Sequence, residues 1–309
     1  MRNILVTGGT GFIGNHLVEE LVKNGYHVKC LVRAKSNVIH LKRLNVELFY
    51  SELNNKEALE KATEGVDTVF HLAAIRGEKK IPKKEYFEVN VLGTKNLLNA
   101  SIKNKVKKFI YCSSVGVTGW PKKLPINENF SYKPKGIYHI SKVLAEKEVL
   151  KRKNEINVVI VRPVIAYGTD DFDGFLLKLY NLFKSKSIIK RIGNGDNYIH
   201  LVSIENLVDG ILKAGEKGKN GEVYIIADAN PIKIKDLNRI ICKALNKKVP
   251  KIFAPIFILR FFSIFLKSLK PKIDIMTKNR YYDISKAKKE MGYKPKESNI
   301  ENVIRSYSK

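Results

Sequence analysis

The sequence predicts an α/β protein whose core is a doubly wound parallel β-sheet. Two observations carry this prediction. Short apolar runs alternate with helical patterns through the first half of the chain, as in a parallel sheet with right-handed crossovers and helices on both faces. The runs are apolar at almost every position, which is typical of strands buried on both faces.

Six such runs are predicted to be strands: Ile4–Thr7, His27–Val32, Val46–Tyr50, Thr68–His71, Lys108–Cys112 and Val158–Arg162. Helical patterns lie between them, at Phe12–Asn24, Lys56–Glu64, Tyr86–Lys103 and Ile137–Lys153. After Arg162 the pattern loosens. Clusters of Gly, Asn and Asp at Gly168–Gly174 and Gly193–Asn197 predict loops near a ligand. A helix at Ser203–Gly215 and a strand at Val223–Ala227 are expected to rejoin the sheet.

Composition narrows the class of protein. The 309 residues are 44% hydrophobic and 28% charged, which is typical of a globular chain that buries a large core. The formal charge of +27 is spread along the chain instead of being gathered in one cluster, so nucleic acid is not the expected partner. Three distant cysteines, Cys30, Cys112 and Cys242, suggest neither a disulfide framework nor a metal site. Without a signal peptide or a run of ~18 apolar residues, we expect a cytoplasmic protein.

A glycine-rich turn follows the first strand and opens the first helix, with the sequence Thr7-Gly8-Gly9-Thr10-Gly11-Phe12-Ile13-Gly14. Glycine allows the tight turn and the close approach of backbone to a pyrophosphate, and the helix N-terminus offers free N–H groups. Because the turn joins a strand to a helix, it predicts a Rossmann-type dinucleotide site. The predicted cofactor contacts in this turn are Gly8, Gly11, Phe12, Ile13 and Gly14.

The end of the second strand bears on the choice of cofactor. NAD sites often place an acidic residue here to bind the ribose 2′-hydroxyl, but this chain has Arg33. A guanidinium suits the 2′-phosphate of NADP. We therefore favour NADP over NAD.

Tyr138 and Lys142 are spaced four residues apart, on one face of a predicted helix. A tyrosine with an ordinary pKa of about 10 is a poor base near neutrality, and an adjacent ammonium lowers that pKa. We expect Tyr138 to exchange a proton with a substrate oxygen while hydride moves to or from nicotinamide, and Ser114 to hydrogen-bond the same oxygen.

The chain resembles the extended branch of the short-chain dehydrogenase/reductase superfamily, also called the NAD-dependent epimerase/dehydratase family. The resemblance covers nearly the whole length. Besides the glycine turn and Tyr138/Lys142, it rests on several segments in order: His71–Ala74, Asn90–Thr94, Ser113-Ser114 before Gly119, Arg162–Gly168, Tyr198–His200 and Tyr282–Ala287.

Position by position, the resemblance implies a catalytic trio of Ser114, Tyr138 and Lys142. It places Ala73 and Ala74 along the cofactor, Pro163 beside the nicotinamide, and Glu52 with Leu53 near adenine. Asn90 is interpreted as a structural residue that bends its helix. The resemblance further implies a Rossmann domain over residues 1–166, rejoined by about 198–227, and a smaller C-terminal substrate-binding subdomain over 167–197 and 228–309.

Two departures from the family pattern limit the reaction. The residues after Ser114 are Val115 and Gly116, which cannot carry protons where 4,6-dehydratases use an Asp-Glu pair, so dehydration is disfavoured. Sugar-nucleotide epimerases usually have an Arg before the Tyr-Ile-His segment, where this chain has Asp196-Asn197. Arg191, Lys190 or Arg280 could substitute.

An apolar segment at Pro255–Lys270 is interrupted by a polar stripe of Arg260, Ser263, Lys267 and Lys270 at helical spacing. It is interpreted as a helix packed in the substrate subdomain or at a dimer interface. A lid over an apolar substrate and a helix on a membrane surface are alternatives. A homodimer acting on a small molecule is expected.

Three functions stay open. In the first, the enzyme acts on a nucleotide sugar, either as an epimerase that keeps NAD(P) bound and returns the hydride, or as a 4-reductase that consumes reduced cofactor. In the second, NADPH reduces the ketone of an apolar substrate, as in the 3β-hydroxysteroid dehydrogenase and dihydroflavonol reductase relatives. The third is a non-catalytic sensor of the dinucleotide, against which the intact Ser114, Tyr138 and Lys142 argue.

Overall fold

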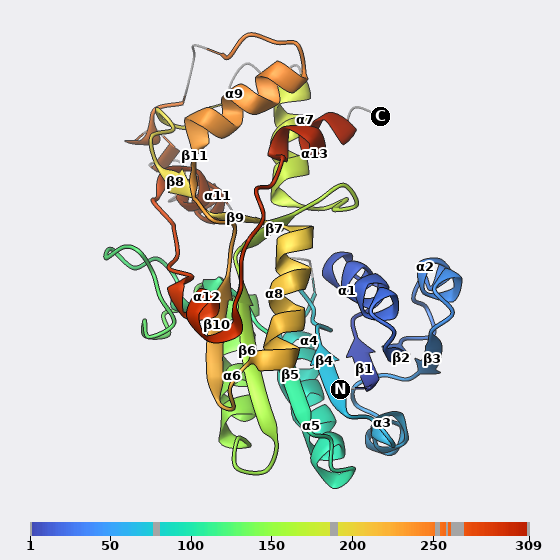
Figure 1. Ribbon diagram of the computed structural model, residues 1–309. Helices are drawn as coiled ribbons and strands as arrows, with labels where there is room; N and C mark the ends of the chain where they lie inside the picture. Colours follow the sequence, from blue (N-terminus) through green and yellow to red (C-terminus); the bar gives the residue numbers. More distant parts are fainter. Residues whose placement is uncertain are drawn as a thin grey trace.

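Seven parallel strands form the central sheet of the computed structural model, which describes residues 2–76, 81–185, 191–250, 254–257, 259–260 and 269–307. The strands are β1 (Asn3–Thr7), β2 (His27–Val32), β3 (Glu47–Tyr50), β4 (Thr68–His71), β5 (Lys108–Cys112), β6 (Asn157–Pro163) and β10 (Glu222–Ile226). Their order is β10-β6-β5-β4-β1-β2-β3 (Figure 1). The order reverses between β1 and β4, and in open α/β sheets the ligand crevice lies outside the carboxyl ends of the strands at such a switch point. The predicted Rossmann-type fold is confirmed.

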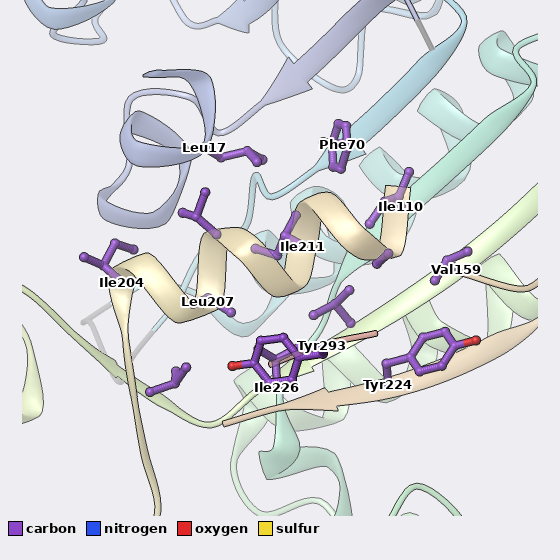
Figure 2. Close-up of a cluster of buried hydrophobic side chains, with 14 of the residues drawn as sticks. Leu17, Phe70, Ile110, Val159, Ile204, Leu207, Ile211, Tyr224, Ile226 and Tyr293 are labelled. Carbon is purple, nitrogen blue, oxygen red and sulfur yellow. The ribbon is translucent and has the colours of Figure 1, made fainter. Parts of the chain in front are cut away.

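Helices cover both faces of the sheet. On one face lie α1 (Phe12–Lys23) and α8 (Ile204–Lys217), and on the other lie α3 (Lys56–Thr63), α5 (Gly93–Lys103) and α6 (Ile137–Lys151). Neighbouring strand residues face opposite sides, so Val6 packs in the α1/α8 core and Leu5 in the α3/α5/α6 core. Figure 2 shows Leu207 and Ile211 of α8 between Leu17 of α1 and the strands.

The helical region before β5 has a different form from the one predicted. Instead of one α-helix over Tyr86–Lys103, the chain forms α4 (Lys83–Phe87), a π-helical turn (Glu88–Leu92) and then α5. The wider turn contains Asn90, whose side chain bonds to the backbone of Ile75 outside the helix. A single π turn of this kind often occurs at a functional site.

A second hydrophobic core lies beyond the sheet. It is built mainly from α7 (Phe175–Lys184), α9 (Ile234–Ala244) and α13 (Ile300–Ser306). Two small strand pairs accompany it: β8 (Tyr198–Ile199) with β11 (Ile232–Lys233), and β7 (Ile165–Tyr167) with β9 (Leu201–Ser203). These strands have two or three residues, too few to show a period of two in the sequence.

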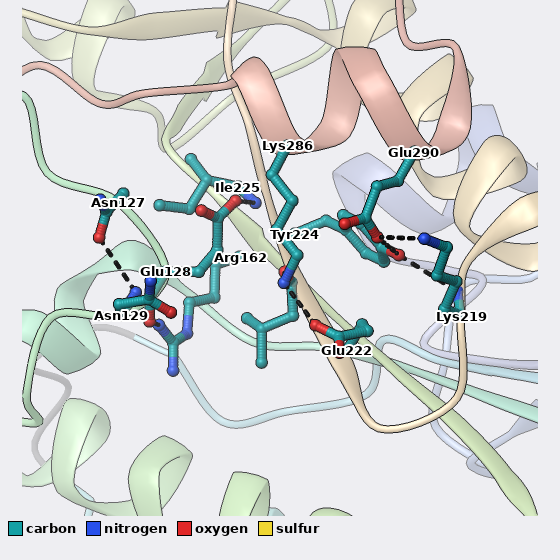
Figure 3. A network of polar contacts seen from close by, with 11 residues as sticks. Asn127, Glu128, Asn129, Arg162, Lys219, Glu222, Tyr224, Ile225, Lys286 and Glu290 are labelled. Atoms are coloured by element: carbon teal, nitrogen blue, oxygen red, sulfur yellow. Dashed lines mark hydrogen bonds and ion pairs between the residues drawn. The ribbon is translucent and has the colours of Figure 1, made fainter.

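A polar network attaches the C-terminal α12 (Ser285–Met291) to β10 (Figure 3). Lys286 lies 2.6 Å from Glu222, and the hydroxyl of Tyr224 donates to Glu290 at 2.9 Å. On the same strand, the Ile225 amide donates to Glu128 at 2.9 Å. The sheet edge is therefore tied to two distant segments of the chain.

The remaining elements are two short helices and the segment Pro255–Lys270. The short α2 (Ile39–Arg43) and α11 (Leu269–Thr277) were not predicted from the sequence. Residues 258 and 261–268 of the predicted helix at Pro255–Lys270 lie outside the described residues, so its packing stays a prediction. In the described part of the chain, every helix is too short or too polar to cross a bilayer.

Candidate active site

The glycine turn packs directly against the end of β4. Gly8 has a φ of +78°, and a Cβ atom there would lie 2.6 Å from the amide nitrogen of Ala73. A Cβ at Gly14 would collide with the carbonyl oxygen of Gly8. Gly11 starts α1 with no side-chain cap, so the first amides of the helix stay available to a phosphate. The residues present fit a dinucleotide pyrophosphate.

The residues predicted around the adenosine follow β2 and β3. Arg33 comes directly after β2 and is exposed. Glu52 is exposed as well, whereas the Leu53 side chain is buried and lies where a Cβ on Gly93 would touch it at 2.8 Å. The Leu53 carbonyl accepts a bond from Asn96 at 3.0 Å.

The residues predicted near the nicotinamide lie at the carboxyl ends of neighbouring strands. Ala73 and Ala74 follow β4, Ser114 follows β5, and Pro163 ends β6. Since all these strands are parallel, their carboxyl ends share one edge of the sheet. The structure thus brings the predicted cofactor and catalytic residues to the same edge.

Lys142 joins helix α6 to the end of β5. Its side chain is buried, and Nζ donates to the carbonyl oxygen of Cys112 at 2.7 Å. Nζ also lies 4.5 Å from the ring centroid of Tyr111. Burial lowers the pKa of Lys142 to about 8, and Cys112 and Glu146 partly oppose this change.

The pKa of Tyr138 differs from the sequence-based prediction. Burial raises it above the usual value, assisted by Cys112. Lys142 was expected to lower this pKa, but its ammonium is directed at the Cys112 carbonyl. The cation that lowers the pKa of Tyr138 is Arg76, and its effect is smaller than that of burial. The neutral phenol is therefore the dominant form near neutrality.

Ser114 caps the 3-10 turn Val115–Thr118. Its Oγ accepts the amide N–H of Gly116 at 3.2 Å. This bond uses a lone pair and leaves the hydroxyl hydrogen free to donate to another oxygen. Ser114 can therefore donate to a substrate oxygen.

A buried hydrogen-bond chain connects the glycine turn to the π-helical turn. The Ala73 amide donates to the hydroxyl of Thr7 at 3.3 Å, and Thr7 Oγ1 lies 2.6 Å from Nδ1 of His71. Nε2 of His71 lies 2.8 Å from Thr94 Oγ1, which itself donates to the Asn90 carbonyl at 2.7 Å. Since the Thr94 hydrogen is used there, Nε2 must be the protonated ring nitrogen. Burial lowers the pKa of His71 to about 3, so the ring is neutral.

Asn90 extends this chain of hydrogen bonds to helix α6, which carries Tyr138 and Lys142. Its amide donates to the Ile75 carbonyl at 3.0 Å and to Ser141 Oγ at 2.9 Å. Ser141 in turn donates to the carbonyl oxygen of Tyr138 at 2.7 Å. The predicted structural role of Asn90 is consistent with these contacts, which hold α6 against the segment after β4.

A buried ion pair anchors the next turn of α6. Glu146 accepts two bonds from Arg162 of β6, at 3.0 and 2.7 Å, and a third from the hydroxyl of Tyr132 at 2.8 Å. Both charged side chains are almost fully buried. Bidentate pairing fixes geometry as well as charge, so it holds Lys142 at a set depth beside β5.

The sequence analysis missed Arg76 and Asp171. The guanidinium of exposed Arg76 lies 3.8 Å from the carboxylate of buried Asp171, which belongs to the predicted ligand loop Gly168–Gly174. In the same loop, Asp170 lies 3.8 Å from His16 of α1. The loop thus contacts both the first helix and the segment after β4. In the sequence, the basic residue just beyond Ala73-Ala74 was the one available indication that Arg76 belongs to the site.

Two of the three substitutes for the missing arginine can be placed. Arg191 donates to the Pro250 carbonyl at 2.8 Å, and Arg280 lies 4.1 Å from the ring centroid of Trp120. Lys190 lies outside the described residues. Asp196, where related epimerases carry the arginine, pairs with Lys235 at 2.6 Å.

Comparison with known proteins agrees with this site. Residues 4–227 match the model of the NAD dependent epimerase/dehydratase family. The chain is 32% identical to a UDP-glucose 4-epimerase of Vibrio cholerae, over 95% of this chain and 91% of the relative. It is 28% identical to a 3β-hydroxysteroid dehydrogenase/Δ5→4-isomerase of Mycobacterium tuberculosis, over 96% of this chain and 86% of the relative. UDP-glucuronic acid 4-epimerase of Bacillus cereus, solved in complex with NAD, superposes with a TM-score of 0.81 and 27% identity, covering 99% of this chain and 97% of that one.

Proposed function

The chain belongs to the NAD dependent epimerase/dehydratase family, and on this premise we propose that it transfers hydride at a secondary alcohol or ketone of a nucleotide sugar, as an epimerase or a 4-reductase. One contact carries the proposal. The bond from Lys142 to the Cys112 carbonyl places α6 beside the end of β5. Ser114 lies two residues after Cys112, the last residue of β5. Tyr138 precedes Lys142 by about one helical turn. This arrangement supports the proposal that the three residues act at one site.

Each of these residues has a separate role in the proposed reaction. A bound dinucleotide supplies or accepts the hydride. Tyr138, whose raised pKa keeps it protonated, donates its proton to the oxygen of a ketone as that carbon is reduced. Ser114 donates a hydrogen bond to the same oxygen. In the oxidising direction the Tyr138 phenolate takes the proton of the substrate hydroxyl, and the positive charge of Arg76 favours that phenolate.

The nucleotide-sugar assignment rests on similarity to the relatives. Both the Vibrio cholerae relative and the Bacillus cereus structure are named for epimerisation of a UDP-sugar. Dehydration stays disfavoured in the proposal because Val115 and Gly116 provide no proton-transfer group after Ser114. Arg33 continues to favour NADP.

A specific observation favours the second candidate, reduction of an apolar ketone. Phe172 is 83% exposed, and it lies in the loop whose Asp170 is 3.8 Å from His16 of α1. Large exposed aromatic rings beside a site are suited to an apolar ligand. The similarity to the mycobacterial steroid dehydrogenase agrees with this alternative.

A product screen with the purified protein tests the proposal. UDP-glucose, UDP-galactose and UDP-glucuronate would be incubated with NAD or NADP, and a 4-keto nucleotide sugar and a 3-ketosteroid with NADPH. Nicotinamide absorbance and products would be followed together. Interconversion of 4-epimers without a net absorbance change indicates an epimerase. Stoichiometric consumption of NADPH by a 4-keto nucleotide sugar indicates a reductase. Turnover of a 3-ketosteroid, with no reaction of any nucleotide sugar, would overturn the proposal in favour of the alternative.

A further inference from the structure

The imidazole of His139 lies against the turn that Ser114 caps. His139 follows Tyr138 in α6, and the centroids of the two rings are 5.1 Å apart. The same imidazole contacts Gly116, where an added Cβ atom would collide with Nε2 of His139. Because the Gly116 amide donates to Ser114 Oγ at 3.2 Å, a single residue separates Nε2 from the candidate catalytic serine. These contacts place the imidazole beside both Tyr138 and Ser114.

Gly116 and His139 are complementary in shape. A side chain at position 116 would have to occupy the space that Nε2 and Cδ2 of the imidazole fill. The turn after Ser114 provides no functional side chain of its own at Val115 or Gly116. Helix α6 instead supplies a ring nitrogen at this place, from a distant part of the chain. A polar group is therefore present where the sequence of the turn alone shows none.

One hydrogen bond determines the tautomer of the half-buried His139. Its Nδ1 lies 2.7 Å from the carbonyl oxygen of Lys135, which directly precedes the N-cap of α6 at Gly136. A carbonyl oxygen can only accept, so Nδ1 carries the hydrogen. In the neutral ring Nε2 is then the acceptor nitrogen, and it is the nitrogen that lies against Gly116. The Lys135 contact thus determines which chemistry the imidazole presents beside Ser114.

The donors and the acceptor of the site indicate which substrates fit. Ser114 and the neutral phenol of Tyr138 are donors, and in the proposed reaction both donate to the ketone oxygen. Nε2 of His139 adds an acceptor to this pair. The combination suits a substrate with an acceptor oxygen at the reacting carbon and a donor hydroxyl close to it. A sugar oxidised at one carbon carries both groups, whereas the isolated ketone of a 3-ketosteroid has no neighbouring hydroxyl.

We propose that Nε2 of His139 binds the substrate, by accepting a hydrogen bond from a substrate hydroxyl close to the reacting carbon. The inference rests on the proposed function and deepens it, because it limits the substrate to a molecule with a hydroxyl near its ketone or secondary alcohol. His139 is then a specificity-determining residue, which favours a sugar over an apolar ketone. Ser114 and Tyr138 contact the reacting oxygen, and His139 contacts the hydroxyl next to it.

The two ring nitrogens of His139 can be removed separately. The amide of asparagine lies as many bonds from Cα as Nδ1 does, and the amide of glutamine as many as Nε2 does. His139→Asn therefore keeps a donor for the Lys135 carbonyl and removes the acceptor beside Gly116, whereas His139→Gln does the reverse. His27→Asn is the matched control, since His27 is exposed at the start of β2, at the opposite edge of the sheet from Ser114.

The test compares UDP-glucose with UDP-3-deoxyglucose and UDP-6-deoxyglucose, which each lack one hydroxyl near the C4 carbon. We expect one analogue to have a kcat/KM about 3–10-fold below that of UDP-glucose with the unmodified protein, the usual effect of losing one neutral hydrogen bond. His139→Asn should abolish this difference by lowering kcat/KM for UDP-glucose alone. His139→Gln should restore part of the difference, and His27→Asn should leave it unchanged. Thermal unfolding of each variant reports separately on the loss of the Lys135 contact.

The outcomes separate this inference from the function on which it rests. A difference that disappears in His139→Asn supports the inference and identifies the hydroxyl that His139 binds. If UDP-glucose reacts but neither analogue is slower, or if His139→Asn slows all three substrates equally, the inference is overturned and the nucleotide-sugar function stands. If the product screen finds no reaction of any nucleotide sugar, the function fails and the inference is overturned with it.

Discussion

Nε2 of His71 lies 2.8 Å from Oγ1 of Thr94, and this bond determines the tautomer of a buried imidazole. Thr94 uses its own hydrogen on the Asn90 carbonyl, so it can only accept from the ring. The other ring nitrogen accepts from Thr7, which adjoins the glycine turn. The cofactor turn and the π-helical turn are thus joined by bonds of fixed direction, and each depends on the next.

We predict that Thr94→Val destabilises the protein by about 1–3 kcal/mol, the cost of leaving a buried polar group without a partner. Valine keeps the shape of threonine but cannot accept the His71 N–H. Urea unfolding would measure the change. Thr94→Ser, which retains the hydroxyl, is the control; equal stability of the Val and Ser variants would show that the bond contributes little.

Tyr138→Phe is predicted to lower turnover by about 10²–10⁴-fold, because the ring stays while the proton-transferring hydroxyl is lost. Cofactor affinity, measured by fluorescence titration, should change less than twofold. Tyr224→Phe is a suitable control, since that hydroxyl bonds to Glu290 at the sheet edge. Near-normal turnover of Tyr138→Phe would mean that another group moves the proton.

Burial of Lys142 should make stability depend on pH. Its pKa is lowered to about 8 in the folded protein from 10.5, so between these values the unfolded chain binds more protons. The free energy of unfolding of the unmodified protein should therefore rise with pH in this window, relative to Lys142→Met, by up to about 1.4 kcal/mol per pH unit. Urea unfolding of both proteins at several pH values tests this. Parallel pH profiles would contradict the lowered pKa.

Arg33 is predicted to select NADP. Fluorescence titration should show tighter binding of NADPH than NADH, and Arg33→Asp should reverse the order because a carboxylate repels the 2′-phosphate and accepts from a 2′-hydroxyl. Arg305→Asp, at the far C-terminal helix, controls for net charge. Equal affinity of the unmodified protein for the two cofactors would rule out this role.

Much of the fold could be predicted because its strands are continuous apolar runs. The predicted and observed bounds of β2, β4 and β5 are identical. The π-helical turn could not be predicted, because it depends on a contact between Asn90 and the backbone of Ile75 that forms only in the folded chain. The same holds for the pair of Arg76 and Asp171, which come from distant segments.

Sequence reasoning named candidate residues that the structure brings to one edge of the sheet, but it did not predict their electrostatics. Spacing alone places Tyr138 and Lys142 on one helical face, and the family resemblance adds Ser114. Spacing does not reveal how deeply each group is buried, and burial has the larger effect on the pKa of both Tyr138 and Lys142. The cation that acts on Tyr138 is supplied by Arg76, which no motif includes.

Strand β10 joins the central sheet far along the sequence from β6, and this position limits where the chain can be truncated. β10 pairs with β6 along five residues, from Glu222 opposite Val159 to Ile226 opposite Pro163. A fragment that ended near residue 166 would leave β6 as an open edge strand, with unpaired amides beside a row of valines and isoleucines. Such edges recruit other chains. We expect that fragment to self-associate when it is expressed alone, so the shortest autonomous unit would have to extend past Ile226.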